Sequence, residues 1–387
     1  MRVAGIVCEY NPFHNGHRQH IERTRAAGYT HIAAIMSPHV VQRGALALFD
    51  KWTRAAAAVR CGADLVLELP TPYAAASAER FAAAAVGLLD ALGVVETVSF
   101  GSESGDAERL RRAAAYLETP EANAAIRCKL AEGVSYPAAR QAALDAIGVR
   151  LTDPNDILGV EYCKAVRARG GRLRLLAVRR VGGRHDGGPA GPLASASFLR
   201  ARFGQAGLAA LRPYVPAEAL ALYRGALAAD PDRIDRVLLD RLRALPPDAY
   251  AGLPDAAEGL HHRLYRCARL APSFDALAMA AKTKRYTLSR IRRMLLCAAL
   301  GVTAADQAQP PPYLRVLAAN ARGRALLSAA DGRAALPVST SLARLREQSP
   351  AAARAAALES ASTDLFTLAT AEILPCGLDY THKAMIL

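Results

Sequence analysis

The chain has 387 residues, 52% of them hydrophobic, which is enough for two or three domains with buried cores. Its formal net charge of +14 indicates a polyanionic partner, although an arginine-rich composition alone would give the same sign. No run of about 18 uninterrupted apolar residues occurs, and the first residues become polar too soon for a signal peptide. We therefore expect neither a membrane span nor export.

The seven cysteines are scattered along the chain, and none belongs to a C-x-x-C pair. This dispersed, odd-numbered set predicts neither a zinc site nor a disulfide framework. Reduced, buried thiols fit a cytoplasmic location best. The sequence thus predicts a cytoplasmic protein with no metal site built from its own side chains, and it gives no indication of the oligomeric state.

Short apolar stretches alternate with helical stretches through the first hundred residues. Strands are expected at residues 3–8, 30–36, 64–69 and 94–100. Helices are expected between them, at residues 17–27, 49–61 and 77–92. This alternation is typical of a Rossmann-like parallel sheet, whose ligands bind at the carboxyl ends of the strands. Polar loops follow Cys8, Met36, Leu69 and Phe100, so all four loops should lie on that edge.

The rest of the chain divides into two further patterns. Residues 106–150 look helical and are expected to form an insertion, and a fifth strand is expected at residues 173–181. From about residue 206 onward the pattern is almost wholly helical. We therefore predict an α/β domain at residues 1–205, followed by a mostly α-helical, basic domain at residues 206–387.

The most informative motif is H-x-G-H, formed by His14, Gly16 and His17 between the first strand and the first helix. Backbone N–H groups and the positive end of the helix dipole favour a phosphate at such a position. Gly16 would let the backbone approach a nucleotide closely. The imidazoles can donate hydrogen bonds as charge develops on a leaving pyrophosphate. The motif predicts a nucleotide site with His14 and His17 as catalytic residues.

A second candidate phosphate motif is Ser195-Ala196-Ser197-Phe198-Leu199-Arg200. Ser195 or Ser197 can cap a helix, and Arg200 one turn later can point at the same anion. Alone, this pattern is also that of an ordinary helix cap. Beside an H-x-G-H motif, it resembles the second phosphate-binding motif of HIGH-type nucleotidyltransferases, which often reads I-S-S-T-x-x-R.

Several blocks occur together in one order along the chain. They are residues 5–17 (GIVCEYNPFHNGH), 41–44 (VQRG), 50–54 (DKWTR), 62–70 (GADLVLELP), 100–103 (FGSE), 154–162 (PNDILGVEY), 283–287 (TKRYT) and 290–293 (RIRR). This set resembles the bacterial tRNA(Met) cytidine acetate ligase family. The resemblance implies a HIGH-type enzyme that uses ATP, with Mg²⁺, to activate acetate as acetyl-adenylate. The acetyl group would then pass to the wobble cytidine of elongator tRNA(Met), forming acetylcytidine.

The resemblance also implies the residues of the ATP site, position by position. They are Val7, Cys8, Glu9, Tyr10, Asn11, Pro12, Phe13, His14, Asn15, Gly16, His17, Arg18, Gln19, His20, Gly101, Asn155, and an arginine at the end of the fifth strand, Arg179 or preferably Arg180. A glycine avoids crowding a base, an amide can read a nucleotide edge, and an arginine neutralises phosphate. A turn glycine, an Asx-turn and a solvated arginine remain the structural alternatives.

Further candidates are charged residues near these blocks. Arg43 and Lys51 flank the exit of the second strand, where they could hold the polyphosphate or a carboxylate substrate, and Glu103 is a candidate magnesium ligand. Contact with tRNA is expected from Lys284, Arg285, Arg292 and Arg293, with Tyr286 stacking on a base, unless this run is only a solvated face.

One departure from the family concerns Ser37-Pro38-His39, where relatives tend to read Ser-Gly-Asn. Pro38 removes a donor N–H, so a ligand contact at this position would be altered. Two other functions also remain open. A simple adenylyltransferase of a cofactor precursor shares H-x-G-H but needs no basic helical domain. A non-catalytic RNA-binding protein would be expected to have lost the histidines, and both are present.

Overall fold

The computed structural model describes residues 1–180, 189–256 and 259–387. The end of the strand predicted at 173–181 and most of the glycine-rich stretch after it lie outside these residues. Among the helices in the described part of the chain, none is both long enough and apolar enough to cross a lipid bilayer.

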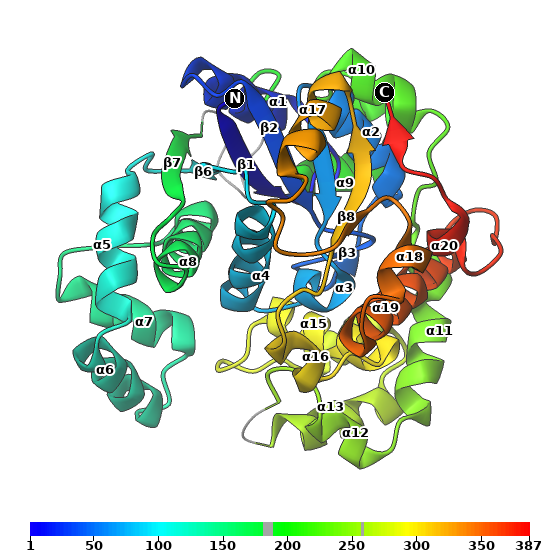
Figure 1. The fold of residues 1–387 in the computed structure, drawn as a ribbon. Coiled ribbons are helices and arrows are strands. Elements are labelled where there is room, and N and C mark those ends of the chain that lie inside the picture. The colour runs from blue at the N-terminus through cyan, green and yellow to red at the C-terminus, as the bar shows by residue number, and fades with distance from the viewer. Residues whose placement is uncertain (181–188, 257–258) are drawn as a thin grey trace.

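A mixed, eight-stranded sheet forms the centre of the described molecule (Figure 1), in the order β10-β8-β5-β2-β1-β6-β7, with β9 beside β8. The parallel strands are β1 (Val3–Cys8), β2 (His31–Met36), β5 (Leu65–Glu68), β6 (Thr97–Ser102) and β7 (Arg174–Arg179). All five predicted strands are confirmed, with ends shifted by a few residues. Together with the flanking helices they confirm the predicted Rossmann-like class.

Helices cover both faces of this sheet and extend beyond it. In the first half they are α1 (Asn15–Ala26), α2 (Lys51–Arg60), α3 (Thr71–Ala74), α4 (Ala78–Ala91), α5 (Ala107–Leu117), α6 (Pro120–Ala131), α7 (Tyr136–Asp145), α8 (Pro154–Ala168) and α9 (Ala196–Ala206). The predicted helical insertion is α5, α6 and α7, which stand to one side of the sheet beside α8 (Figure 1).

The second half is mostly helical, as predicted. It contains α10 (Ala217–Tyr223), α11 (Pro231–Ala244), α12 (Pro247–Ala251), α13 (Leu260–Leu270), α14 (Phe274–Ala281), α15 (Leu288–Leu300), α16 (Ala304–Ala308), α17 (Ala321–Ala330), α18 (Leu342–Arg346), α19 (Pro350–Leu368) and α20 (Leu378–Thr381). Three short strands, which the sequence did not predict, lie among these helices. β8 (Leu314–Ala319), β9 (Val338–Ser339) and β10 (Met385–Ile386) extend the sheet, with β8 antiparallel to β5.

The two faces of the sheet belong to separate cores because successive side chains of a strand point in opposite directions. In β2, Ala33 and Ile35 pack into the core that contains Leu89 of α4. Ala34 and Met36 pack into the core on the other side, with the alanines of α2. A third core joins α11, α13, α14 and α15 to α19. This layering leaves the carboxyl ends of β1, β6 and β7 open for a ligand.

A small hairpin, β3 (Val40–Val41) with β4 (Ala45–Leu46), follows β2 and contacts α15. Gly44 has a φ of +73°, and a Cβ there would lie 2.4 Å from the backbone nitrogen of Arg293. Only glycine allows both this backbone conformation and this approach. The hairpin therefore connects the nucleotide edge of the sheet to the helices of the second half.

Candidate active site

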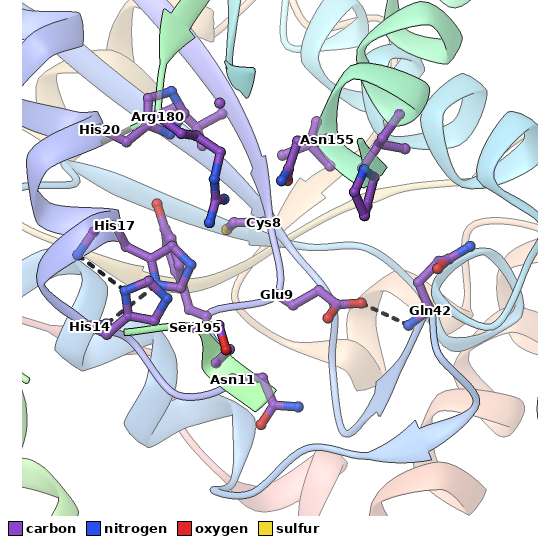
Figure 2. A pocket seen from close by; sticks show the side chains of 18 of the residues that line it. Cys8, Glu9, Asn11, His14, His17, His20, Gln42, Asn155, Arg180 and Ser195 are labelled. Carbon is purple, nitrogen blue, oxygen red and sulfur yellow. Dashed lines mark hydrogen bonds between the residues drawn. The ribbon is translucent and has the colours of Figure 1, made fainter. Parts of the chain in front are cut away.

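A cavity of about 460 Å³ opens at the carboxyl ends of β1, β6 and β7. The amino ends of α1, α8 and α9 also line it, so three helix dipoles contribute positive potential to one space. Figure 2 shows the side chains that face it. Its described wall carries five arginines, three histidines and one carboxylate. Such a cavity is suited to a polyanion.

His14 and His17 form the start of α1. His14 Nδ1 accepts a hydrogen bond from Gly16 N at 3.1 Å, and His17 Nδ1 accepts one from His14 N at 3.3 Å. The two rings are stacked, with centroids 3.6 Å apart (Figure 2). Because both Nδ1 atoms accept, each neutral ring carries its proton on Nε2. The loop therefore presents two imidazole N–H donors.

The electrostatics of the cavity keep these rings neutral. Burial, with the nearby positive charge of Arg180, lowers the pKa of His14 to about 3. Burial and the same arginine also hold the pKa of His17 well below its usual value. A bound phosphate would oppose this shift by supplying negative charge. Glu9 is the one carboxylate on the described wall, so the cavity favours an anionic ligand.

Gly16 lines the cavity, and its backbone also supports the histidine loop. Its backbone N–H is already bound to His14, and a Cβ at Gly16 would lie 3.0 Å from the His14 ring. The glycine is therefore needed to make room for the imidazole. The Gly16 N–H is thus already used within the loop.

The second predicted phosphate motif lies on the same cavity. Ser195 caps α9 by accepting from Phe198 N at 3.2 Å. Arg200 donates to Asn11 O at 2.7 Å and to Ser197 Oγ at 3.2 Å. Burial lowers the pKa of Arg200, which nevertheless stays charged near neutral pH. The α9 motif and the histidine loop are thus joined directly.

Arg179 and Arg180 both line the cavity, with different surroundings. Arg180 N donates to Ser102 O at 2.8 Å, and its side chain crosses Gly101, whose added Cβ would lie 3.4 Å from Arg180 Cγ. Its charge contributes to the lowered pKa of the neighbouring histidines, including His20, whose pKa falls to about 4 mainly through burial. Arg179 packs on Gly105 instead. The geometry favours Arg180 as the phosphate ligand.

Asn155 lies at the start of α8, across the cavity from the histidines (Figure 2). Its Nδ2 donates to Glu103 Oε1 at 2.5 Å, while Glu103 Oε2 accepts from Asp156 N at 3.0 Å. Because the carboxylate only accepts, the atom of Asn155 that faces it must be the nitrogen. The amide oxygen is left for a donor on a ligand. With both oxygens engaged, Glu103 does not fit the expected role of magnesium ligand.

Four residues of the expected ATP segment do not line the described cavity. They are Pro12, Phe13, Asn15 and Arg18. Phe13 is fully buried in the core, and Arg18 pairs with Glu218 on α10 at 3.2 Å. Asn15 donates to Pro192 O instead. Pro12 and Phe13 precede α1, and the helix turns Asn15 and Arg18 away from the cavity, which His14, His17 and His20 line.

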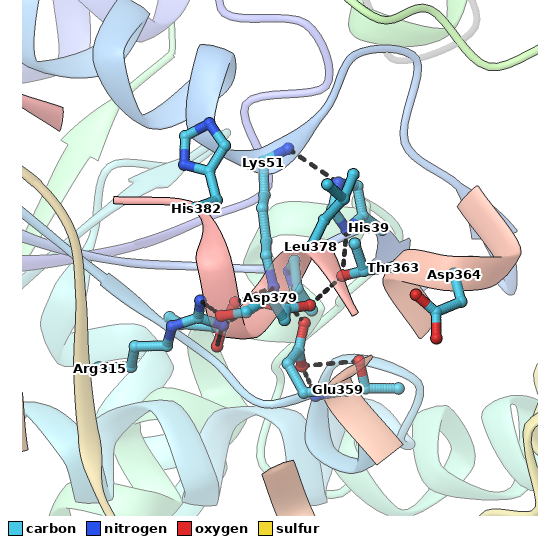
Figure 3. A network of polar contacts seen from close by, with 12 residues as sticks. His39, Lys51, Arg315, Glu359, Thr363, Asp364, Leu378, Asp379 and His382 are labelled. Atoms are coloured by element: carbon cyan, nitrogen blue, oxygen red, sulfur yellow. Dashed lines mark hydrogen bonds and ion pairs between the residues drawn. The ribbon is translucent and has the colours of Figure 1, made fainter. Parts of the chain in front are cut away.

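Lys51 is a clear correction. Its side chain is fully buried, and its Nζ lies 2.6 Å from Glu68, 2.6 Å from Asp379 and 2.7 Å from Glu359 (Figure 3). It therefore cannot reach a polyphosphate. These three carboxylates could by themselves suit a metal ion, but the ammonium group occupies their centre. Arg43, in contrast, lines the cavity at an exposed position.

The Ser37-Pro38-His39 departure also lies outside the cavity wall. His39 is buried, and its Nε2 accepts from Lys51 N at 3.2 Å, so its Nδ1 donates to Thr363 Oγ1 at 3.0 Å. Pro38 O accepts from Arg54. Pro38 and His39 therefore contribute to packing between the first and second halves of the chain and not to the cavity.

The predicted tRNA cluster divides into two parts. Lys284 and Arg285 are exposed just before α15. Arg293 is only 8% exposed and donates to Gln42 O at 3.2 Å, while Arg292 pairs with Asp275 at 2.8 Å. Tyr286 is buried in the helical core, which excludes the expected stacking on a base. Burial thus makes Arg293 a support for the hairpin rather than a contact for a polyanion.

Sequence reasoning missed several residues that shape the site. Phe81 of α4 and Tyr162 of α8 line the cavity. Arg54, fully buried, donates to Glu9 O at 2.6 Å and to Ser37 O at 3.1 Å, so it holds the loops after β1 and β2 together. The only local signal for this role was an arginine directly before the apolar run of residues 55–59.

A parallel sheet whose first strand leads into an H-x-G-H helix, beside a serine–arginine helix cap, defines a nucleotidyltransferase of the HIGH class. The family model of that description, HIGH Nucleotidyl Transferase, matches residues 1–375. Among relatives, the tRNA(Met) cytidine acetate ligase of Syntrophotalea carbinolica is 41% identical over 368 residues, covering 90% of this chain and 87% of that protein. The enzyme of the same name from Caldanaerobacter subterraneus is 33% identical, with 99% of each chain covered.

Solved structures agree with this assignment. Thermotoga maritima TmcAL in its apo form matches with a TM-score of 0.93 and 31% identity, over all of both chains. The same protein bound with alpha-thio ATP matches with a TM-score of 0.91. This chain belongs to the tRNA(Met) cytidine acetate ligase family.

Proposed function

We propose that this protein is an ATP-dependent ligase that activates acetate and acetylates the wobble cytidine of elongator tRNA(Met). The observation that carries the proposal is the pair of Nε2–H donors of His14 and His17, set with Arg180 and Arg200 around one cavity. An acetate oxygen attacks the α-phosphorus of ATP, and pyrophosphate leaves. Donors fixed in advance stabilise the charge that develops on the phosphate oxygens.

Recognition of the base falls to Asn155 in this proposal. Its free amide oxygen accepts a hydrogen bond from the amino group of adenine, whereas guanine presents a carbonyl at the equivalent position. Magnesium fits only as an ion carried by the ATP phosphates, because Glu9 is the single carboxylate on the described cavity wall. When bound, it neutralises phosphate charge.

The tRNA would be held by the second half of the chain. Lys282, Lys284 and Arg285 are exposed in the segment before α15, and the whole chain carries a net charge of +14. In this proposal residues 1–205 carry the nucleotide site, and the helices within residues 206–387 carry the tRNA-binding surface. The enzyme would work in the cytoplasm, where ATP, acetate and tRNA are all available.

The test uses the purified protein with labelled acetate, ATP and bulk tRNA. Acetate-dependent exchange of pyrophosphate into ATP, with label recovered on cytidine of tRNA(Met), is the expected result. GTP should not replace ATP. Turnover of phosphopantetheine or nicotinate mononucleotide without any response to acetate would instead select a cofactor adenylyltransferase. Absence of ATP binding would select a non-catalytic RNA-binding protein.

A further inference from the structure

Glu9 is the only acidic residue on the described wall of the cavity, where the other charged groups are arginines. A carboxylate beside a triphosphate is repelled by it, so its presence calls for a different ligand group. We infer that Glu9 is a catalytic residue of the second half-reaction, placed to accept a proton from the N4 amino group of the acceptor cytidine. This inference rests on the proposed function.

Two hydrogen bonds fix the position of Glu9, one to its side chain and one to its backbone. Its Oε1 accepts from Gln42 N at 2.8 Å, and its backbone oxygen accepts from Arg54 at 2.6 Å. Figure 2 shows the side chain extending toward Gln42 and away from the imidazoles of His14 and His17. Among the described residues, no hydrogen bond is made to Oε2. One oxygen is therefore anchored, and the other is available to an amine donor.

The same hairpin connects Glu9 to the expected tRNA surface. The N–H of Gln42 binds Glu9, and its carbonyl accepts from Arg293 of α15 at 3.2 Å. Because Gly44 has no side chain, the first turns of α15 pack directly against the hairpin. The exposed residues Lys284 and Arg285 come immediately before this helix. A tRNA held there lies next to the element that positions the carboxylate.

This placement suits the chemistry of acetyl transfer. The N4 lone pair attacks the carbonyl carbon of acetyl-adenylate, and a carbon–nitrogen bond forms. The bond from that carbon to the phosphate oxygen breaks, and AMP leaves with the electron pair. The proton lost by N4 passes to Glu9 Oε2 and then to water. Carboxylates also recognise the cytosine N4 amine directly in nucleic-acid complexes, so one side chain both orients and deprotonates the nucleophile.

The experiment separates the two half-reactions in the Glu9→Gln variant of the full chain. Glutamine keeps the shape and can still accept from Gln42 N, but it cannot take a proton. Transfer from chemically synthesised acetyl-adenylate to tRNA(Met) should fall by about 10²-fold or more, the usual contribution of a general base. Acetate-dependent exchange of pyrophosphate into ATP should stay close to the wild-type rate. Glu22→Gln, at an exposed position on α1, is the matched control and should change neither rate.

Two results would overturn the inference. Unchanged transfer in Glu9→Gln would exclude a proton acceptor at this position. A parallel loss of exchange and transfer, with an altered Mg²⁺ requirement, would make Glu9 part of the activation step. Glu9→Asp, which keeps the carboxylate, should recover part of the transfer rate if the fold of the variants is intact. Because the transfer assay supplies acetyl-adenylate, it is read independently of whether the wild-type protein activates acetate.

Discussion

The cavity and the cluster around Lys51 are both rich in charge, but the charges are balanced differently. In the cluster, Lys51 and Arg315 are surrounded by Glu68, Glu359 and Asp379, all with almost no exposed surface (Figure 3). In the cavity, five arginines and three histidines face a single carboxylate. Charge alone therefore does not identify a binding site. Among the described residues, the basic side chains of the cavity outnumber its carboxylates and favour an anionic ligand, whereas the buried ion pairs of the cluster hold the fold together.

Removal of the central charge of the cluster should have the largest effect. Lys51→Met removes the ammonium group that three buried carboxylates share and leaves Arg315 to pair with only two of them, so we expect the free energy of unfolding to fall by about 3–5 kcal/mol. Denaturant unfolding followed by circular dichroism measures this. Lys129→Met, on the surface of α6, should cause no measurable change. Equal behaviour of the two variants would show that the cluster does not stabilise the fold.

A histidine of the cavity should affect chemistry instead of stability. His17→Ala removes an N–H donor at the site of developing charge, so acetyl-adenylate formation should fall by about 10²–10³-fold. Binding of tRNA should remain close to wild type, because His17 lies at the nucleotide edge. Pyrophosphate exchange and filter binding give the two readouts, with the exposed His262→Ala as control. A similar loss in both readouts would indicate misfolding.

The cluster should also be visible as a dependence of stability on pH. Burial, and the neighbouring Glu68 carboxylate, raise the pKa of Glu359 from 4.5 to about 7, so its proton binds more tightly in the folded state. This contribution to stability is full below pH 4.5 and is lost as the pH rises to about 7. His39 faces the same cluster, and burial holds its pKa well below the usual value, so the wild-type curve in this pH range includes its titration as well.

The informative quantity is therefore the difference between wild type and Glu359→Gln. The stability of the wild type relative to this variant should decrease between pH 4.5 and 7. Denaturant unfolding at a series of pH values within that window provides the measurement. A constant difference would mean that Glu359 stays charged in the fold.

The smallest effect is expected at the solvent-exposed edge of the second half. Lys284→Ala combined with Arg285→Ala should weaken tRNA binding modestly and reduce the salt slope of the binding constant by about 2, since each phosphate contact contributes about one unit. Filter binding across a range of salt concentrations measures both. Arg127→Ala with Lys129→Ala on α6 removes the same charge elsewhere. An equal loss in that control would indicate a non-specific effect of net charge.

Much of the fold could be predicted from the sequence because its signals are local. The apolar runs of β1, β2, β5 and β6 are bounded by polar loops, and His14 and His17 follow β1 within ten residues. The strand β8 was missed because it lies among helices and pairs with β5 from nearly 250 residues away. Periodicity within a short window carries no information about such a partner.

The sequence by itself determined the α/β class, the family and the edge of the sheet where a nucleotide would bind. These follow from short-range patterns of apolar, glycine and histidine residues. Only the tertiary structure decided that Lys51 is structural and that Arg43 faces the cavity, although both belong to one stretch of chain. The partner of Lys51, Glu359, is 308 residues away. Whether a charged side chain binds a ligand or stabilises the fold depends on the groups packed against it. Folding brings those groups together from distant parts of the chain.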